Sequence, residues 1–315
     1  MSYQQLTEGQ RYQIFTLLAE GYSQSAIAKR VSVHRSTICR ELKRNSDDSR
    51  YRPDRANTLS VQRRSQASKY RISQDTIWFV EMVLGWDWSP EQISAIAKRI
   101  DLPVSPEWIY QHIARNKAQG GLLYKHLRQG HKRYRRGKHT VRKPIVNSVS
   151  IDERPAIVDT RERLGDWEAD TVLGKQGTGV LVTLAERKSK LYLVKRVHSK
   201  EADVVKDAII EMLMPYKAHV HTITFDNGGE FAGHESIAAA LDAKAYFAHP
   251  YSSWERGLNE NFNGLLRQYV PKGTDLRQVS DEYIEQAQTR INLRPRKCLE
   301  FRQPKVFFDE LLQAA

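Results

Sequence analysis

Two acidic residues, Asp226 and Glu260, stand in positions where a carboxylate is available for chemistry. Asp226 follows the β-branched run Val220–Phe225, which predicts a buried strand. The sequence Asn227-Gly228-Gly229 then forces a turn. Glycines beside a carboxylate at a strand end let a ligand come close to the backbone. We therefore take Asp226 as a candidate catalytic residue.

Glu260 lies in a predicted helix from about Ser252 to Tyr269, opened by a capping box of Ser252 and Glu255. The apolar stripe of this helix consists of Leu258, Phe262, Leu265, Leu266 and Tyr269. Glu260 lies off that stripe, on a face shared with Asn263, Gly264 and Arg267. A carboxylate there is either a functional group or one of the many solvated carboxylates of a protein surface.

Both acids lie in stretches that resemble the catalytic core of bacterial insertion-sequence transposases of the IS-thirty family, namely FDNGGEF and HPYSSWERGLNENFNGLLRQYVPKGTDL. Their separation in the sequence matches that between the second and third positions of the family's Asp-Asp-Glu triad. The stretch GDWEADTVLG (165–174) resembles the block with the first position, which falls on Asp170. The resemblance implies that Asp170, Asp226 and Glu260 are both the catalytic residues and the metal ligands.

Three carboxylates without Cys or His suit Mg²⁺, which prefers oxygen ligands. Two such ions roughly 3.5–4 Å apart can activate a nucleophile and stabilise the leaving oxygen in phosphoryl transfer. We therefore expect two Mg²⁺ ions per active site, with Mn²⁺ as a substitute. In this hypothesis Asp170 bridges both ions, Asp226 holds one and Glu260 holds the other. The same site would cut DNA and then transfer the strand.

Charge is distributed unevenly along the 315 residues, whose formal net charge is +13. Residues 1–145 contain 27 Lys and Arg against 12 Asp and Glu, whereas residues 146–315 contain 23 against 25. A basic front half indicates a module that binds a polyanion such as double-stranded DNA. The resemblance specifies this DNA as the terminal inverted repeats and the target, held by a homodimer or larger assembly.

Cysteine content and hydropathy address the compartment. Cys39 and Cys298 are the only cysteines, which fits a reducing, cytoplasmic location. The resemblance to bacterial transposases implies that the protein is also associated with the nucleoid. The polar start MSYQQLTEGQ is no signal peptide, and the richest apolar run, Ile77–Trp86, is far shorter than the ~20 residues of a membrane span. We expect no membrane association and no cofactor other than the metal.

Residues 6–45 predict three helices, of which the last two, at about 23–30 and 34–44, have helix-turn-helix spacing. The third helix presents polar and basic residues that could enter the major groove of DNA, namely His34, Arg35, Ser36, Thr37, Arg40, Lys43 and Arg44. An ordinary three-helix bundle with a basic surface is the alternative.

Residues 75–118 predict a second three-helix unit in which Trp86 and Trp88 are core anchors. Its candidate DNA contacts are Tyr110, Gln111 and Arg115. The run from Gly120 to Lys143 has no apolar periodicity and predicts a flexible basic arm, with Arg133, Arg135 and Arg136 as DNA contacts. Asn263 and Arg267 are further candidates for contact with DNA.

From residue 160 onward, strands alternate with helices, which predicts a mixed α/β sheet. The resemblance implies a ribonuclease-H-like, retroviral-integrase-like fold with Asp170 and Asp226 on neighbouring central strands. The predicted domains are a helix-turn-helix at 1–46, a basic linker at 47–74, a second helix-turn-helix-like module at 75–118, the arm at 119–150, the catalytic domain at 151–275 and a helical tail at 276–315.

Two other functions remain open at this point. One is a sequence-specific DNA-binding regulator whose integrase-like domain no longer catalyses, and the other is a nuclease of the same fold that does not join strands. The intact triad favours catalysis over the regulator. The two helical modules favour a transposase over a plain nuclease, which needs neither.

Overall fold

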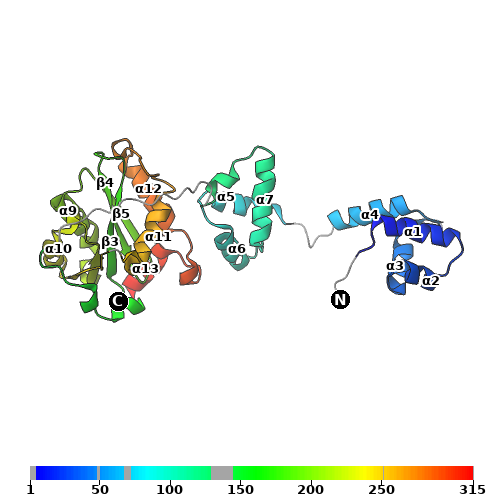
Figure 1. Cartoon of the computed structure of the whole chain (residues 1–315), viewed down its shortest axis with the longest axis horizontal. Coiled ribbons are helices and arrows are strands. Elements are labelled where there is room, and N and C mark those ends of the chain that lie inside the picture. The colour runs from blue at the N-terminus through cyan, green and yellow to red at the C-terminus, as the bar shows by residue number, and fades with distance from the viewer. Residues whose placement is uncertain (1–4, 48–49, 67–71, 129–144, 251, 315) are drawn as a thin grey trace. The chain divides into compact units, whose positions relative to one another are not determined.

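The computed structural model describes residues 5–47, 50–66, 72–128, 145–250 and 252–314. The chain divides into two compact units, Met1–Ser73 (unit 1) and Gln74–Ala315 (unit 2) (Figure 1). Among the helices of the described ranges, none has the length and apolar content that a membrane span requires.

Unit 1 begins with the three helices expected of a helix-turn-helix, α1 (Glu8–Ala19), α2 (Gln24–Arg30) and α3 (Arg35–Asn45). Thr7 caps α1 in a capping box with Gln10, as its sequence predicts, and Ser23 and His34 cap α2 and α3. The core of the unit is apolar because each helix contributes a fully buried isoleucine, namely Ile14, Ile27 and Ile38.

A short hairpin, β1 (Ser46–Asp47) and β2 (Arg50–Tyr51), leads into a fourth helix, α4 (Pro53–Gln66). The range 47–74, interpreted from the sequence as a linker, thus contributes a helix that packs on α1 and α3. Ala56 of α4 is fully buried in the core of the unit. Polar bonds complete the attachment, since Arg11 donates to the side-chain oxygen of Asn57 at 3.1 Å and Arg63 donates to Asn45.

Unit 2 begins with a helical module of α5 (Gln74–Leu84), α6 (Pro90–Arg99), α7 (Pro106–Ala118) and the 3-10 turn η2 (Leu123–His126). Ser89 and Ser105 cap α6 and α7, each followed by a proline at the first helical position. Trp88 is buried as predicted, but the expectation that Trp86 is also a core anchor is wrong, because its side chain is 48% exposed.

The helical module is bonded to the end of the chain. The Asp87 carboxylate accepts a hydrogen bond from the Tyr269 hydroxyl at 2.9 Å and lies 2.8 Å from Nδ1 of His126. Gln92 donates to the carbonyl oxygen of Pro295 at 2.6 Å, and Lys297 pairs with Glu91 at 2.6 Å. Unit 2 is therefore one body made of the module and the sheet domain.

The five-stranded sheet has the order β5-β4-β3-β6-β7. Its strands are β3 (Asp166–Leu173), β4 (Val180–Glu186), β5 (Tyr192–Val197), β6 (Thr222–Phe225) and β7 (Lys244–Phe247). The first three pair antiparallel, while β6 is parallel to both β3 and β7. This is the mixed, ribonuclease-H-like sheet expected from the sequence, with β3 in the middle.

Helices cover both faces of the sheet (Figure 1). On one face Trp167 and Ala169 of β3 join a core with α9 (Ala202–Leu213) and α10 (His234–Leu241). On the other, Val172 joins a core with α11 (Gly257–Leu266) and α12 (Asp281–Asn292). The last helix, α13 (Pro304–Gln313), places Phe308 against Trp167 with the ring centroids 6.2 Å apart. Because β3 side chains alternate between the faces, Asp170 lies on the α11 face.

Short turns connect these elements, namely η3 (Ile151–Glu153), α8 (Ile157–Thr160), η4 (Met214–His219), η5 (Gly229–Phe231), η6 (Ser253–Arg256), η7 (Leu276–Gln278) and η8 (Lys297–Leu299). The capping box predicted for Ser252 and Glu255 is wrong, since η6 precedes α11 and Ser252 makes no side-chain cap bond. The Glu255 carboxylate instead accepts a hydrogen bond from the backbone N–H of His249 at 2.8 Å. The long helix therefore begins later than expected, at Gly257.

Candidate active site

Asp170 and Asp226 lie side by side at the centre of the sheet. Strand β3 pairs in parallel with β6, and Glu168 of β3 is the partner of Thr224 of β6. Asp170 lies two positions after Glu168, and Asp226 lies two positions after Thr224. Parallel strands that advance together end at the same edge of a sheet. The two carboxylates are therefore brought together although they lie far apart in the sequence.

Arg256 lies between the two aspartates. Its Nη1 is 3.6 Å from Oδ1 of Asp170 and its Nη2 is 3.7 Å from Oδ2 of Asp226. The guanidinium group also donates to the backbone carbonyl of Ala169 at 3.2 Å, and its side chain is only 12% exposed. A positive charge in this position offsets the repulsion between two neighbouring carboxylates.

Hydrogen bonds orient both carboxylates. Asp170 accepts from the backbone N–H of Thr171 at 2.9 Å and from the side-chain amide of Asn263 at 2.7 Å. Asp226 accepts from the backbone N–H of Gly228 at 2.9 Å. Asn263 is itself held, because its oxygen accepts from the Tyr192 hydroxyl at 2.8 Å. Helix α11 is thus tied to β3 through Asn263.

The environment of Asp170 favours its protonated form. Burial raises the pKa of the Asp170 carboxyl above its ordinary value, and the nearby Asp226 charge raises it further. Arg256 opposes both effects and lowers the pKa. A cation with more charge than one guanidinium, bound at the same place, would hold the carboxylate ionised more strongly.

A third carboxylate, Glu230, adjoins the pair. A methyl group on Gly228 would meet Oε2 of Glu230 at 2.3 Å and Oδ1 of Asp226 at 2.8 Å, so both carboxylates lie against this glycine. Glu230 accepts from the Thr171 hydroxyl at 2.9 Å and pairs with Lys200 at 2.7 Å. The sequence places Glu230 near the turn without indicating these contacts, which join residues distant in sequence.

Glu260 lies one helical turn before Asn263 on α11 and is exposed, and its carboxylate makes no hydrogen bond or ion pair with the residues that the structure describes. Glu260 and Asn263 are three positions apart in a helix and so share a face. In the described ranges, no three His, Cys, Asp or Glu side chains already form a cluster that could hold a metal ion. The structure therefore gathers two acids of the predicted triad, with the third on the adjoining helix.

A buried ion pair supports the strand that carries Asp170. Glu168, on the same strand, is 2.5 Å from the Arg187 guanidinium and accepts from the backbone N–H of Asn259 at 3.3 Å. Burial raises the pKa of Glu168, while Arg187 opposes that shift. Loss of one partner would leave an unpaired buried charge, a change that typically costs about 3–5 kcal/mol. The bond from Asn259 to Glu168 ties the start of α11 to β3.

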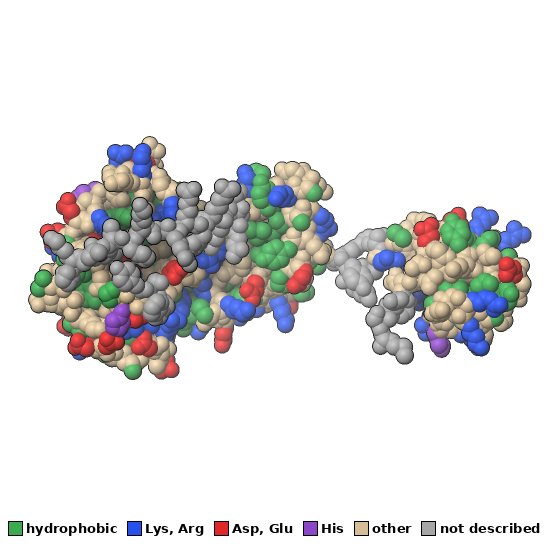
Figure 2. Space-filling view, in the orientation of Figure 1, with side chains coloured by type: hydrophobic (Ala, Val, Ile, Leu, Met, Phe, Trp, Pro, Cys, Tyr) green, Lys and Arg blue, Asp and Glu red, His purple; other side chains and the backbone are tan. Residues whose placement is uncertain are grey.

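Predicted DNA contacts in unit 1 lie mostly on the surface of α3. His34, Arg35, Arg40, Lys43 and Arg44 are exposed, whereas Ser36 and Thr37 are partly buried. Nδ1 of His34 accepts a hydrogen bond from the backbone N–H of Ser36 at 3.2 Å, which caps the helix. Figure 2 shows Lys and Arg side chains on the drawn face of this unit.

The other predicted contacts differ in environment. Tyr110, Gln111 and Arg115 are exposed on α7. Arg267 is partly buried and donates to the carbonyl oxygen of Leu173 at 2.8 Å, while Asn263 is occupied by Asp170. Arg133, Arg135 and Arg136 lie outside the described residues. DNA contact by any of these side chains stays a prediction.

Arg256 is the main residue of the site that the sequence analysis missed. It stands in the stretch Trp254-Glu255-Arg256-Gly257, within the block that carries the family resemblance. In the sequence, Arg256 could have been recognised as a single basic residue about one helical turn before Glu260, the predicted catalytic glutamate. His249, which opens the stretch HPYSSWER of the same block, is exposed and lies 2.8 Å from Glu255 and 2.9 Å from Asp152.

Comparisons with known proteins bear on this geometry. A family described as "Helix-turn-helix domain" matches residues 2–45. The transposase for insertion sequence element IS4351 of Bacteroides fragilis is 39% identical, over 98% of this chain and 96% of the relative. Transposase InsI for insertion sequence element IS30A of Escherichia coli (strain K12) is 34% identical, over 95% of this chain and 82% of the relative.

Among solved structures, the catalytic core domain of BIV integrase is similar with a TM-score of 0.39 and 18% identity, over 47% of this chain and 96% of that one. A helix-turn-helix unit precedes a mixed sheet with two aspartates on neighbouring strands, and the curated relatives match nearly the whole length. The chain belongs to the IS30 family of insertion-sequence transposases.

Proposed function

We propose that this protein is a polynucleotidyl transferase that binds the terminal inverted repeats of an insertion sequence, cuts the DNA there and joins the cut strands to target DNA. In the first step water attacks a phosphodiester and the bond to the 3′ oxygen breaks. In the second, the freed 3′-hydroxyl replaces the 3′ oxygen of a target phosphodiester. The observation that carries the proposal is the meeting of Asp170 and Asp226 in a chain of this family.

We infer that Asp170, Asp226 and Glu260 hold two Mg²⁺ ions, which Mn²⁺ can replace. The residues fit such ions, since the donors are carboxylate oxygens and the Arg256 guanidinium already lies between two of them. When bound, the ions would activate the attacking oxygen and stabilise the leaving one.

The contribution of the chain itself is to orient these groups. Asn263 and the N–H of Thr171 direct the Asp170 carboxylate, and the N–H of Gly228 directs that of Asp226. Glu260 and Asn263 share a face of α11, so the bond from Asn263 to Asp170 keeps the Glu260 side of the helix at the site. Rigid placement of this kind supports catalysis because little reorganisation is needed during the reaction.

We further propose that a homodimer or larger assembly forms on DNA, because two element ends must be cut and joined together. The substrate of this assembly is chromosomal DNA. We therefore infer that the protein acts in the bacterial cytoplasm, on the nucleoid. Light scattering of the protein with one-end and paired-end duplexes measures the stoichiometry. A monomer on paired ends would contradict the assembly.

Asp226→Asn tests the catalytic proposal. We expect the variant to lose Mg²⁺- or Mn²⁺-dependent strand cleavage and transfer, because a neutral amide is a far weaker ligand for a hard cation. Its fold and its binding of element ends should persist, as measured by thermal unfolding and gel shift. Asp242→Asn is the matched control, since it removes one carboxylate of the same domain at an exposed position.

Each outcome of this test has a definite meaning. Undiminished transfer by Asp226→Asn would remove Asp226 from the mechanism. Cleavage without joining by the unmodified protein would identify a nuclease of the same fold. End binding without any cleavage, with either metal, would identify a DNA-binding regulator.

A further inference from the structure

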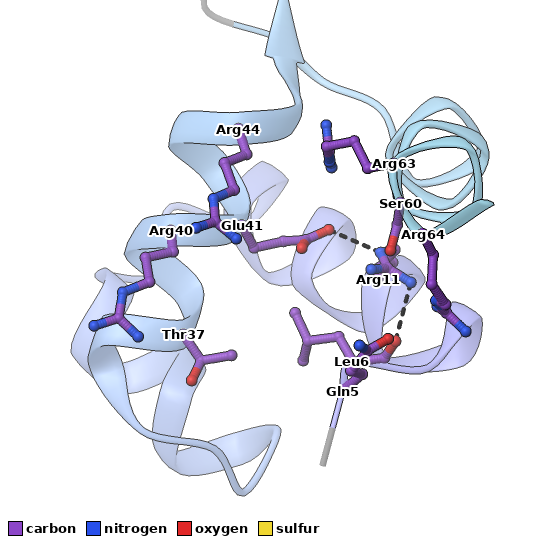
Figure 3. Close-up of a pocket in the computed structure, with 10 residues that line it drawn as sticks. All are labelled: Gln5, Leu6, Arg11, Thr37, Arg40, Glu41, Arg44, Ser60, Arg63 and Arg64. Atoms are coloured by element: carbon purple, nitrogen blue, oxygen red, sulfur yellow. Dashed lines mark hydrogen bonds and ion pairs between the residues drawn. The ribbon is translucent and has the colours of Figure 1, made fainter. Parts of the chain in front are cut away.

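Unit 1 contains a cavity of about 530 Å³ between α3 and α4 (Figure 3). From α3 it is lined by Thr37, Arg40, Glu41 and Arg44, which follow the i, i+3, i+4, i+7 spacing of one helical face. From α4 it is lined by Ser60, Arg63 and Arg64, which lie at offsets of three and four along that helix. Two helices thus turn one face each toward the same space.

The cavity is strongly basic. Five arginines line it, namely Arg11 of α1 and the four arginines of α3 and α4 named above. Glu41 is the single acidic lining residue among those described. Glu41 is 9% exposed, and its Oε1 already accepts bonds from Arg11 at 2.8 Å and from the Tyr51 hydroxyl at 3.1 Å. The charge of Glu41 is therefore used internally by Arg11, and the other four arginines pair with no carboxylate among the residues that the structure describes.

Those four arginines are open to a ligand to different degrees. Arg63 donates to the side-chain oxygen of Asn45. Arg40, Arg44 and Arg64 are exposed, and their guanidinium groups bond to no other residue within the described part of the chain. Guanidinium groups that share a cavity repel one another, and an anion bound among them relieves that repulsion.

We propose that this cavity binds one phosphate group of the DNA backbone, with Arg44 of α3 and Arg64 of α4 as its ligands from the two sides. The inference rests on the proposed DNA binding by unit 1. Guanidinium groups match phosphate oxygens in pairs of parallel hydrogen bonds, which suits a phosphodiester. Free phosphate offers the same chemistry, so the test separates the two sources.

The position of Arg40 connects the cavity to the helix that meets DNA. Arg40 lines the cavity and also belongs to the exposed face of α3 that carries the predicted base contacts. A phosphate in the cavity therefore belongs to the backbone that flanks the groove entered by α3. Helix α4 lies beyond the matched helix-turn-helix residues 2–45, and this assignment adds it to the DNA-binding surface.

The test compares Arg44→Ala, Arg64→Ala and their double variant in the full chain. The probes are fluorescent duplexes with a matched element end or a scrambled end, at three salt concentrations. We expect the double variant to bind both duplexes roughly 10-fold more weakly or worse, and its salt slope to fall by about one unit for one lost phosphate. The two single losses should be non-additive, because both arginines hold one phosphate.

Arg52→Ala is the matched control, since Arg52 is an exposed arginine beside the start of α4 that does not line the cavity. We expect little change in its affinity, and charge-preserving Arg44→Lys with Arg64→Lys should keep the salt slope. Thermal unfolding of every variant separates lost binding from lost fold. Unchanged DNA affinity in the folded double variant, or additive single losses, would overturn the proposal.

Inorganic phosphate provides the second arm. Phosphate should raise the unfolding temperature of the unmodified protein above that in chloride of equal ionic strength, but not that of the double variant. Stabilisation by phosphate with unchanged DNA affinity would assign the cavity to the free anion and overturn the DNA contact. Because these measurements involve no cleavage, they stand apart from the fate of the Asp226 test.

Discussion

At the scale of single residues, Gly228 determines whether Asp226 and Glu230 can stand next to each other. Its backbone has an ordinary φ of −80°, so conformation is not the reason for a glycine here. The reason is space, because any Cβ would meet the Glu230 and Asp226 oxygens at 2.3 and 2.8 Å.

We therefore predict that Gly228→Ala displaces both carboxylates. Strand transfer should fall at least tenfold, and stability should fall by about 1–3 kcal/mol, as is typical of overpacking. Strand-transfer assays and thermal unfolding measure the two effects. Gly229→Ala is the control, since a Cβ there meets nothing within 4 Å. Equal activities of the two variants would refute this account of Gly228.

The residues of the site were predictable from sequence to different degrees. Asp170 and Asp226 belong to blocks with a family pattern, and the sheet brings them together as expected. The position of Arg256 could not be foreseen, because it depends on where an irregular turn folds back onto two strands. Its contacts with Asp170 and Asp226 join segments far apart in the sequence, and local periodicity carries no information at that range.

At the scale of elements, the ends of helices and strands that follow an apolar pattern were predicted accurately. The ends that depend on polar contacts were not. The sequence predicts a helix at His234–Leu241 and a strand at Lys244–Phe247 from their apolar patterns, and α10 and β7 have these bounds. The start of α11 was misplaced because Glu255, which suits a capping box, bonds to His249 instead. Helix α4 begins at Pro53, where the sequence predicts no more than a short helix within a linker, because Asn57 and Arg63, rather than an apolar stripe, help to anchor it.

Helix α3 should separate base reading from backbone binding along its length. In helix-turn-helix proteins the N-terminal residues of the recognition helix usually meet base edges, and more distal basic residues often meet phosphates. We predict that Arg35→Ala reduces discrimination between a true and a mutated end by about 1–3 kcal/mol. Lys43→Ala should weaken binding to all DNA equally and lower the salt slope by about one unit.

Competition binding with matched and scrambled ends at two salt concentrations measures both quantities. Lys43→Arg, which keeps the charge, is the control for the second variant. Full discrimination by Arg35→Ala would show that α3 is not the reader, and α7 with Tyr110, Gln111 and Arg115 would then be the better candidate.

At the scale of the whole molecule, the boundary between the units falls at Ser73 and Gln74. The α5–α7 module, which the sequence analysis grouped with the basic front half, is bonded within unit 2 through Asp87, Gln92 and Glu91. A fragment that ends at residue 145 would leave these bonds unmade. Charge distribution along the sequence could not reveal this, since charge alone does not say which surfaces pack together.

We predict that residues 1–73 form an independently folded DNA-binding fragment. The fragment has 14 Lys and Arg against 6 Asp and Glu, and its apolar core extends from Leu6 to Ala56. It should unfold cooperatively and bind duplex DNA with a steep dependence on salt. Circular dichroism and gel shifts measure both, with residues 74–315 as the comparison. A fragment 1–73 that is unfolded or does not bind would contradict this division.

The packing of Phe308 against Trp167 has a consequence for the order in which the two units fold during translation. The core of unit 1 closes within Met1–Ser73, whereas that of the sheet domain needs a side chain from the last helix of the chain. At bacterial rates of synthesis the interval between the two is roughly 10–50 s. During translation the chain can therefore hold DNA before it can cut it, and each new molecule has time to engage DNA near the ribosome that is still making it.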